Sequence, residues 1–122
     1  GNLQVLDELG AVAFAAGSIG LVLSEENNLP LHPKLFQNLP NPFNPTTTIP
    51  FAVPMPSQVV LVVYTILGQE VRTLVREVLQ PGYHRVEWNS KDDWGRPVSS
   101  GIYLYRLKIG EFIDVKKAIL LK

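Results

Sequence analysis

The chain has 122 residues, 46% of them hydrophobic, and its 11 basic residues balance its 11 acidic ones. These values fit one globular domain with an extension. Balanced charge gives no strong field for nucleic acid or an anionic membrane, so we expect neither as a partner. The absence of cysteine excludes a disulfide framework, a thiolate metal site and a cysteine nucleophile.

The first 33 residues differ from the rest, and we interpret them as an apolar extension followed by a linker. Residues 9–23 carry no charge, but the run is shorter than the ~20 residues that span a bilayer, so we predict no membrane span. Read as a strand, it places Val12 and Phe14 on one face, and Ile19 and Leu21 align after a possible bend at residues 17–18. We favour this added strand, although the same residues also fit an apolar stripe on a helix.

From residue 34 to residue 122 the sequence predicts a β-domain. Valine and isoleucine are abundant, as is typical of strands, and turn signals recur about every ten residues. The expected strands cover residues 47–53, 59–66, 71–78, 83–89, 101–109 and 111–121. With no helical interval between them, they indicate an all-β, antiparallel sandwich.

The alternation of residue types within these strands predicts the core. Inward positions are expected to be apolar or aromatic, and outward neighbours such as Arg85 and Lys108 polar. The expected core residues are Ile49, Phe51, Val53, Val59, Leu61, Val63, His84, Val86, Trp88, Tyr103, Tyr105 and Leu107. We expect His84 to be a core residue with satisfied hydrogen bonds rather than a catalyst.

Residues 36–48, which we call the asparagine–proline segment, read FQNLPNPFNPTTT. Each of its three prolines fixes φ, removes a backbone donor and pushes the preceding residue towards an extended conformation. Asn41 and Asn44 precede prolines, where their amides can close local turns. The segment therefore predicts a rigid, extended entry into the β-domain.

This segment also resembles the start of the C-terminal sorting domain of type IX secretion cargo (type A), which typically reads QN-x-PNPFNP-x-T-x-I-x-F. The resemblance covers about residues 34–122. It continues through VVLVVYTILGQEV (residues 59–71), PGYH (81–84), SGIYLYRL (100–107) and KKAILLK (116–122). The run DDWGRPV (92–98) is similar to the immunoglobulin-like domain of the flagellar hook-capping protein.

The resemblance implies an immunoglobulin-like sandwich that acts as a sorting or surface-attachment module at the outer membrane or outside the cell. Its partner would be the export or attachment machinery of the outer membrane. In that family the last strand takes part in recognition by the export machinery. By resemblance, this role falls on Lys116, Lys117, Leu120, Leu121 and Lys122, although Ala118 stands where the family often has methionine.

The chain departs from the family pattern at Pro50, Ala52, Val60 and Val62, where outward positions of the first two long strands are usually polar. If those strands pair, the four residues form an exposed apolar patch, and such patches usually mark contact surfaces. Pro50 also removes a ladder donor, which predicts an edge strand or a bulge. As an alternative function, residues 11–23 of one copy could add to this patch on another copy and build an extracellular filament. Two other interpretations stay open: the segment covers the patch within its own chain, or residues 1–28 are the last strands of an upstream domain.

Other chemistry is weakly indicated, so we expect no enzyme, no cofactor and no metal site. Asp92 and Asp93 are weak candidates for calcium, but the EF-hand spacing and its terminal glutamate are missing, and a turn is the favoured interpretation. Five aromatic residues could suggest an accessory carbohydrate-binding module, the third functional hypothesis. Most of them alternate inward, which favours core positions: Tyr83, Trp88, Trp94, Tyr103 and Tyr105.

Overall fold

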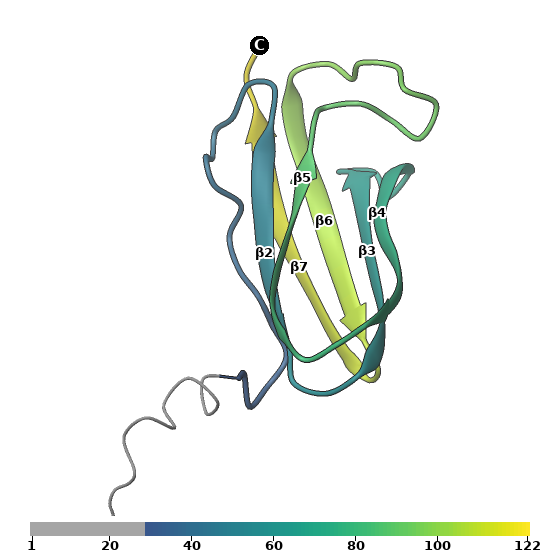
Figure 1. The fold of residues 1–122 in the computed structure, drawn as a ribbon. Helices are drawn as coiled ribbons and strands as arrows, with labels where there is room; N and C mark the ends of the chain where they lie inside the picture. The colour runs from purple at the N-terminus through teal and green to yellow at the C-terminus, as the bar shows by residue number, and fades with distance from the viewer. Residues whose placement is uncertain (1–28) are drawn as a thin grey trace, which may run out of the picture.

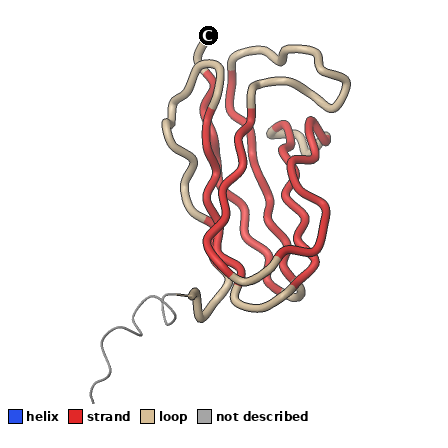
Figure 2. Tube along the Cα trace, in the orientation of Figure 1, coloured by secondary structure: helices blue, strands red, loops and turns tan. Residues whose placement is uncertain are grey.

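The structure is a computed structural model that describes residues 29–122. In this range it contains strands and loops but no helix, as Figure 2 shows, and hence no helix that could cross a membrane. The expected added strand, with Val12, Phe14, Ile19 and Leu21, lies outside the described residues. The predicted boundary between the N-terminal extension and the β-domain, after residue 33, stays a prediction.

Seven strands form two layers that face each other (Figure 1). Six of them correspond to the predicted strands with ends shifted by up to two residues, and the two-residue strand β1 was not predicted. Their bounds are β1 (Lys34–Leu35), β2 (Thr47–Val53), β3 (Ser57–Thr65), β4 (Glu70–Leu79), β5 (Gly82–Trp88), β6 (Gly101–Ile109) and β7 (Phe112–Leu120).

One sheet has the strand order β1-β2-β5 and the other the order β4-β3-β6-β7. All of these strand pairs are antiparallel. β3 and β4, like β6 and β7, are consecutive neighbours in one sheet, whereas β2 and β3 lie in opposite sheets. The prediction of an all-β, immunoglobulin-like sandwich is therefore confirmed.

The core lies between the two sheets and confirms most of the predicted set. Ile49, Val59 and Leu61 are fully buried, and the Trp88 side chain is 1% exposed. His84 and Val86 do point inward, but the prediction that they are buried core residues was too strong, because β5 is an edge strand. The His84 ring stacks on Phe51, and its Nε2 donates a hydrogen bond to the Gln80 carbonyl.

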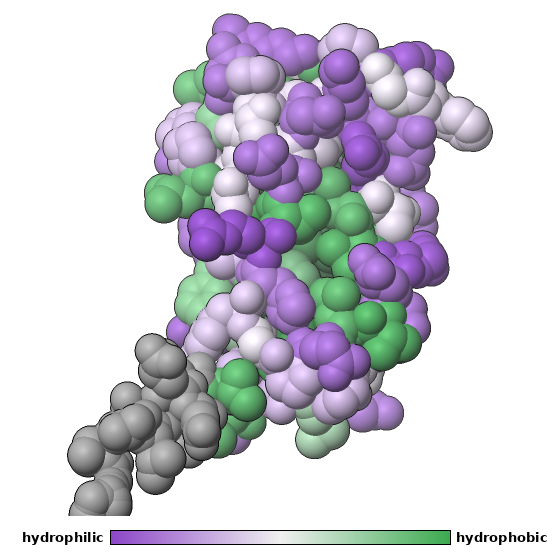
Figure 3. All heavy atoms as spheres, in the orientation of Figure 1, coloured by the Kyte–Doolittle hydropathy of each residue, from purple (hydrophilic) through white to green (hydrophobic). Residues whose placement is uncertain are grey.

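The side of the sandwich between the edge strands β4 and β5 is less well covered than the rest. Figure 3 shows apolar side chains gathered at this place. Leu74, Leu79 and Val86 pack against the core there but remain partly exposed. This opening explains why the inward residues of β5 are only half-buried.

Pro50 does not lie at a sheet edge, and its strand carries no bulge, so that prediction was wrong. It sits in β2, between β1 and β5, where Phe36 donates its backbone N–H to the Pro50 carbonyl. Pro50 has no N–H to return. The hydroxyl of Tyr105 donates to the Phe36 carbonyl instead, at 2.9 Å. A core side chain thus supplies the donor that proline lacks.

The turn between β3 and β4 is tight and has its glycine at positive φ. Gly68 has φ of 87° and donates its N–H to the Thr65 carbonyl.

An added Cβ at Gly68 would meet nothing within 4 Å. Gly68→Ala should therefore lower the free energy of unfolding only by the cost of the left-handed backbone conformation, about 1–2 kcal/mol in denaturant unfolding. Gly68→Asn should cost clearly less, because asparagine tolerates this region. Equal costs would contradict the turn geometry.

Candidate functional site

The asparagine–proline segment runs beside the C-terminal half of β7 and bonds to its edge. Gln37 Nε2 donates to the Lys117 carbonyl at 2.6 Å, and the Ile119 N–H donates to Asn41 Oδ1 at 2.8 Å. Phe43 N–H donates to the Ile119 carbonyl, and Leu121 N–H donates to the Phe43 carbonyl. The segment therefore satisfies backbone groups that an edge strand would otherwise present to another chain.

Phe43 also anchors the segment in the core. Its side chain is 2% exposed, and its ring lies 5.6 Å from the Trp88 ring. Trp88 in turn meets the edge of Tyr103 at 5.2 Å, an arrangement that aromatic pairs favour. The Phe43 backbone thus pairs with β7 while its side chain fills the end of the sandwich.

A buried polar network fixes the start of the segment. Asn38 is 1% exposed, and its Nδ2 donates to Thr47 Oγ1 and to the Pro40 carbonyl. Thr47 Oγ1 also donates to the Pro40 carbonyl, and Asn38 N–H donates to the Tyr105 hydroxyl at 2.8 Å. Because each of these buried groups has a partner, the network holds the segment in one conformation.

Tyr105 joins this network to the four-stranded sheet. Its hydroxyl accepts from Asn38 and donates to Phe36, two residues that lie more than 60 positions away in sequence. Burial raises the pKa of Tyr105 to about 12. The hydroxyl therefore keeps its proton, and with it the bond to Phe36, throughout the physiological pH range.

The five residues assigned to export recognition divide by exposure. Lys117, Leu121 and Lys122 are exposed, Lys116 is half-buried and Leu120 is fully buried. In the folded domain a partner could therefore contact four of them but not the Leu120 side chain. The sequence did not single out Gln37 or Phe43 as neighbours of this strand. The only sequence signal for this contact was that the family resemblance includes both regions, the asparagine–proline segment and the last strand.

The predicted apolar patch of Pro50, Ala52, Val60 and Val62 does not exist as one surface. The prediction was conditional on pairing of the two strands, but β2 and β3 lie in opposite sheets. The residues therefore divide between the two outer faces of the sandwich. In addition, Ala52 and Val62 are only 2% and 3% exposed. Self-assembly itself stays a hypothesis.

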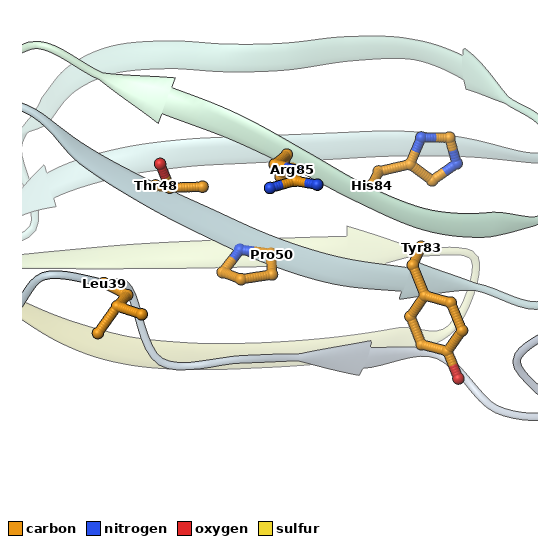
Figure 4. A pocket seen from close by; sticks show the side chains of 6 residues that line it. All are labelled: Leu39, Thr48, Pro50, Tyr83, His84 and Arg85. Atoms are coloured by element: carbon orange, nitrogen blue, oxygen red, sulfur yellow. The ribbon is translucent and has the colours of Figure 1, made fainter.

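A shallow depression lies on the outer face of the three-stranded sheet. It is lined by Leu39, Thr48, Pro50, Tyr83, His84 and Arg85, and Figure 4 shows their side chains around β2 and β5. A second depression shares Tyr83 and is lined by residues 30–34, Phe36 and Ala52. Tyr83 is 64% exposed between them.

The aromatic residues do not form a common platform for a sugar. Trp88, Tyr103 and Tyr105 are core residues, as predicted. Tyr83 begins β5, whereas Trp94 is 79% exposed in the loop after β5, at the opposite end of that strand (Figure 1). Tyr83 and Trp94 thus share no common surface for a sugar, and the carbohydrate-binding hypothesis stays a prediction.

Asp92 and Asp93 use their carboxylates to bind their own loop. Asp92 Oδ1 accepts from the amides of Arg96 and Trp94, and the bond from Arg96 N–H is the main reason why the pKa of Asp92 is lowered. Asp93 Oδ1 accepts from the Thr73 amide at 2.9 Å. Within residues 29–122 no group of three or more acidic or histidine side chains could hold a metal ion. The favoured prediction, a turn, agrees with these bonds.

The fold and these contacts define an immunoglobulin-like module. A family model of the FlgD Ig-like domain matches residues 43–110, which is more than half of the chain. The chain therefore belongs to the FlgD Ig-like domain family. No curated protein matches the chain in sequence.

Two solved structures from Porphyromonas gingivalis share the fold. Dimeric latent PorU aligns with 73% of this chain and 9% of its own, at 19% identity and a TM-score of 0.58. PorZ is described as an essential bacterial surface component of the type-IX secretion system. It aligns with 88% of this chain and 13% of its own, at 18% identity and a TM-score of 0.53. The chain spans a small share of either protein's length, and at these identities the likeness concerns the fold alone.

Proposed function

We propose that this chain is a non-enzymatic module, located outside the cell or on the outer membrane, that a type IX export or attachment machinery recognises. The recognised surface is the C-terminal end of β7 and the residues that follow it. It comprises the exposed Lys117, Leu121 and Lys122 and the half-buried Lys116. No cofactor is required for this role.

One observation carries the proposal. The two sequence blocks that open and close the resemblance, residues 37–51 and 116–122, are far apart in the chain but are joined by four hydrogen bonds. A terminal strand frays unless it is held by other contacts. These bonds hold the last residues in a defined shape, and a receptor that binds a preorganised strand avoids part of the ordering cost.

Residues beyond β7 are held as well. The Leu121 N–H bonds to Phe43, and the Lys122 N–H donates to Ser100 Oγ at 2.9 Å. The Leu121 side chain is 55% exposed and directly precedes Lys122 in the chain. An apolar side chain among cations at a fixed end suits a partner surface with an apolar pocket and acidic rim.

The test is export of a reporter that carries the full chain at its C-terminus, in a bacterium with a type IX system. We expect the triple substitution Lys116→Glu, Lys117→Glu and Lys122→Glu to retain the reporter inside the cell, because it reverses the charge of the recognised surface. Leu121→Asp should have the same effect by removing the apolar contact. The quantity measured is the extracellular fraction of the reporter.

The matched control reverses three cations elsewhere, through Lys34→Glu, Arg85→Glu and Lys91→Glu. These residues are exposed and lie outside β7. The control should be exported like the original chain. Thermal unfolding of all variants separates lost recognition from lost folding. Normal export of both the triple variant and Leu121→Asp, with folding intact, would contradict the proposal.

A further inference from the structure

The outer face of the four-stranded sheet combines apolar and cationic side chains. Four cations stand directly opposite apolar residues of neighbouring strands. Arg76 and Lys108 both face Val60, Arg106 faces Val62, and Lys117 faces Leu104. We call this the cationic apolar face. Around the buried Val62 it comprises Val60, Leu104, Ile113, Val115, Arg76, Arg106, Lys108 and Lys117.

Within the described residues, this face keeps apolar side chains exposed and cations outside the ion pairs. Ile113 and Val115 are 48% and 44% exposed in the edge strand β7. Neither of the two ion pairs found in residues 29–122 involves any of the four cations. Glu70 stands opposite Tyr64 and Glu111 lies in the turn before β7, at the two ends of the face, whereas Asp114 and Glu77 pair with the inward-facing Leu107 and Val59. A contiguous apolar surface with unpaired charge usually marks a contact site.

The N-terminal residues have the complementary composition. Residues 1–28 contain four acidic residues and no lysine or arginine, so their net charge is −4. Residues 29–122 contain 11 basic and seven acidic residues, so their net charge is +4. The acids form two pairs, Asp7–Glu8 and Glu25–Glu26, that flank the uncharged run of residues 9–23. An apolar run between acidic pairs matches an apolar face that carries cations.

The chain leaves the domain on the opposite layer. Residues 30–34 line the second depression together with Ala52 and Tyr83, on the outer face of the three-stranded sheet. Sheets stack ~10 Å apart, with side chains adding to both outer faces, whereas the five residues 24–28 span at most ~17 Å. Within one chain, part of the apolar run would be used in turning round the sandwich. A second copy offers the same face without this turn.

We propose that residues 9–23 of one copy dock on the cationic apolar face of a second copy, with the acidic pairs placed against its cations. The donor segment and the acceptor face are different parts of the same chain. The contact is therefore heterologous, and each bound copy offers a new acceptor, so the product is a head-to-tail assembly. This face shares only Lys117 with the surface proposed for export recognition.

Two full-chain variants test the proposal. The donor variant carries Glu25→Lys and Glu26→Lys, and the acceptor variant carries Arg106→Glu and Lys108→Glu. Like charges across an interface are strongly unfavourable, so each variant should self-associate about tenfold or more weakly than the original chain. The measurement is light scattering across a concentration series, with thermal unfolding as the check on folding.

Mixing makes the test specific. The donor variant keeps an intact acceptor face, and the acceptor variant keeps an intact N-terminal segment. Their mixture should assemble again with the two variants alternating, because each N-terminal segment then meets a face of opposite charge on the other variant. A single chain with all four substitutions should assemble again, because the charges are exchanged. Docking within one chain would leave the mixture monomeric and would overturn the proposal.

The matched control is Lys34→Glu with Arg85→Glu, two charge reversals on the outer face of the other sheet, where Figure 4 shows Arg85. It should assemble like the original chain. The proposal is overturned if the original chain is a monomer at all concentrations. It is also overturned if the acceptor variant assembles normally, or if the control weakens assembly equally.

Discussion

Phe43→Ala should lower the free energy of unfolding by about 3–5 kcal/mol, the range for truncation of a buried phenylalanine. The Phe43 ring is 2% exposed and packs against Trp88. Its loss leaves a cavity at the end of the sandwich. The same residue bonds to Ile119 and Leu121 through its backbone, so β7 should loosen as well. Chemical denaturation measures the change.

The control for Phe43→Ala is Leu39→Ala in the same segment. Leu39 is 73% exposed, and a substitution of an exposed side chain usually changes stability by about 0.5 kcal/mol or less. The backbone bridge between Leu39 and Thr48 is retained. If the two variants lost similar stability, the claim that Phe43 anchors the segment would be wrong.

Tyr105→Phe should cost about 2–6 kcal/mol, because it leaves two backbone groups, one buried and one part-buried, without partners. The Asn38 N–H loses its acceptor and the Phe36 carbonyl loses its donor. Each unsatisfied buried group costs about 1–3 kcal/mol. Since Pro50 has no N–H, nothing in β2 can replace the lost donor. Tyr83→Phe, at an exposed position, should be neutral in the same denaturation assay.

The pH dependence gives an independent signature of Tyr105. Burial raises its pKa from 10.0 to about 12. Below pH 10 both states are protonated and the contribution to stability is fully present. As pH rises from 10 towards 12, only the unfolded state loses the proton, so stability falls. Tyr105→Phe should lose less stability over this window than the original chain, and an identical loss would contradict the assignment.

Local patterns predicted most of the fold. Alternation placed Ile49, Leu61 and Tyr105 in the core, and the recurring turn signals divided the strands, because both signals depend on neighbouring residues only. The prediction failed where the outcome depends on distant contacts. The burial of His84 depended on β5 being an edge strand, and no local pattern records that.

The candidate site was predicted less completely. Alternation alone does not say which sheet a strand joins, so Pro50 and Val60 were placed on one patch although they lie on opposite layers. Pro50 was expected at an edge because its missing donor was visible in the sequence. The compensating hydroxyl of Tyr105 was not visible there. The pairing of Phe43 with β7 joins residues nearly 80 positions apart, which no periodicity reveals.

Amide hydrogen exchange at Leu121 measures how firmly the asparagine–proline segment holds the C-terminal end. Leu121 lies beyond the end of β7, one residue from the last residue described, and its N–H has the Phe43 carbonyl as its bonding partner. We expect exchange as slow as that of the interior strand β6, through opening of the whole domain. Exchange at the rate of a frayed terminus would contradict this expectation.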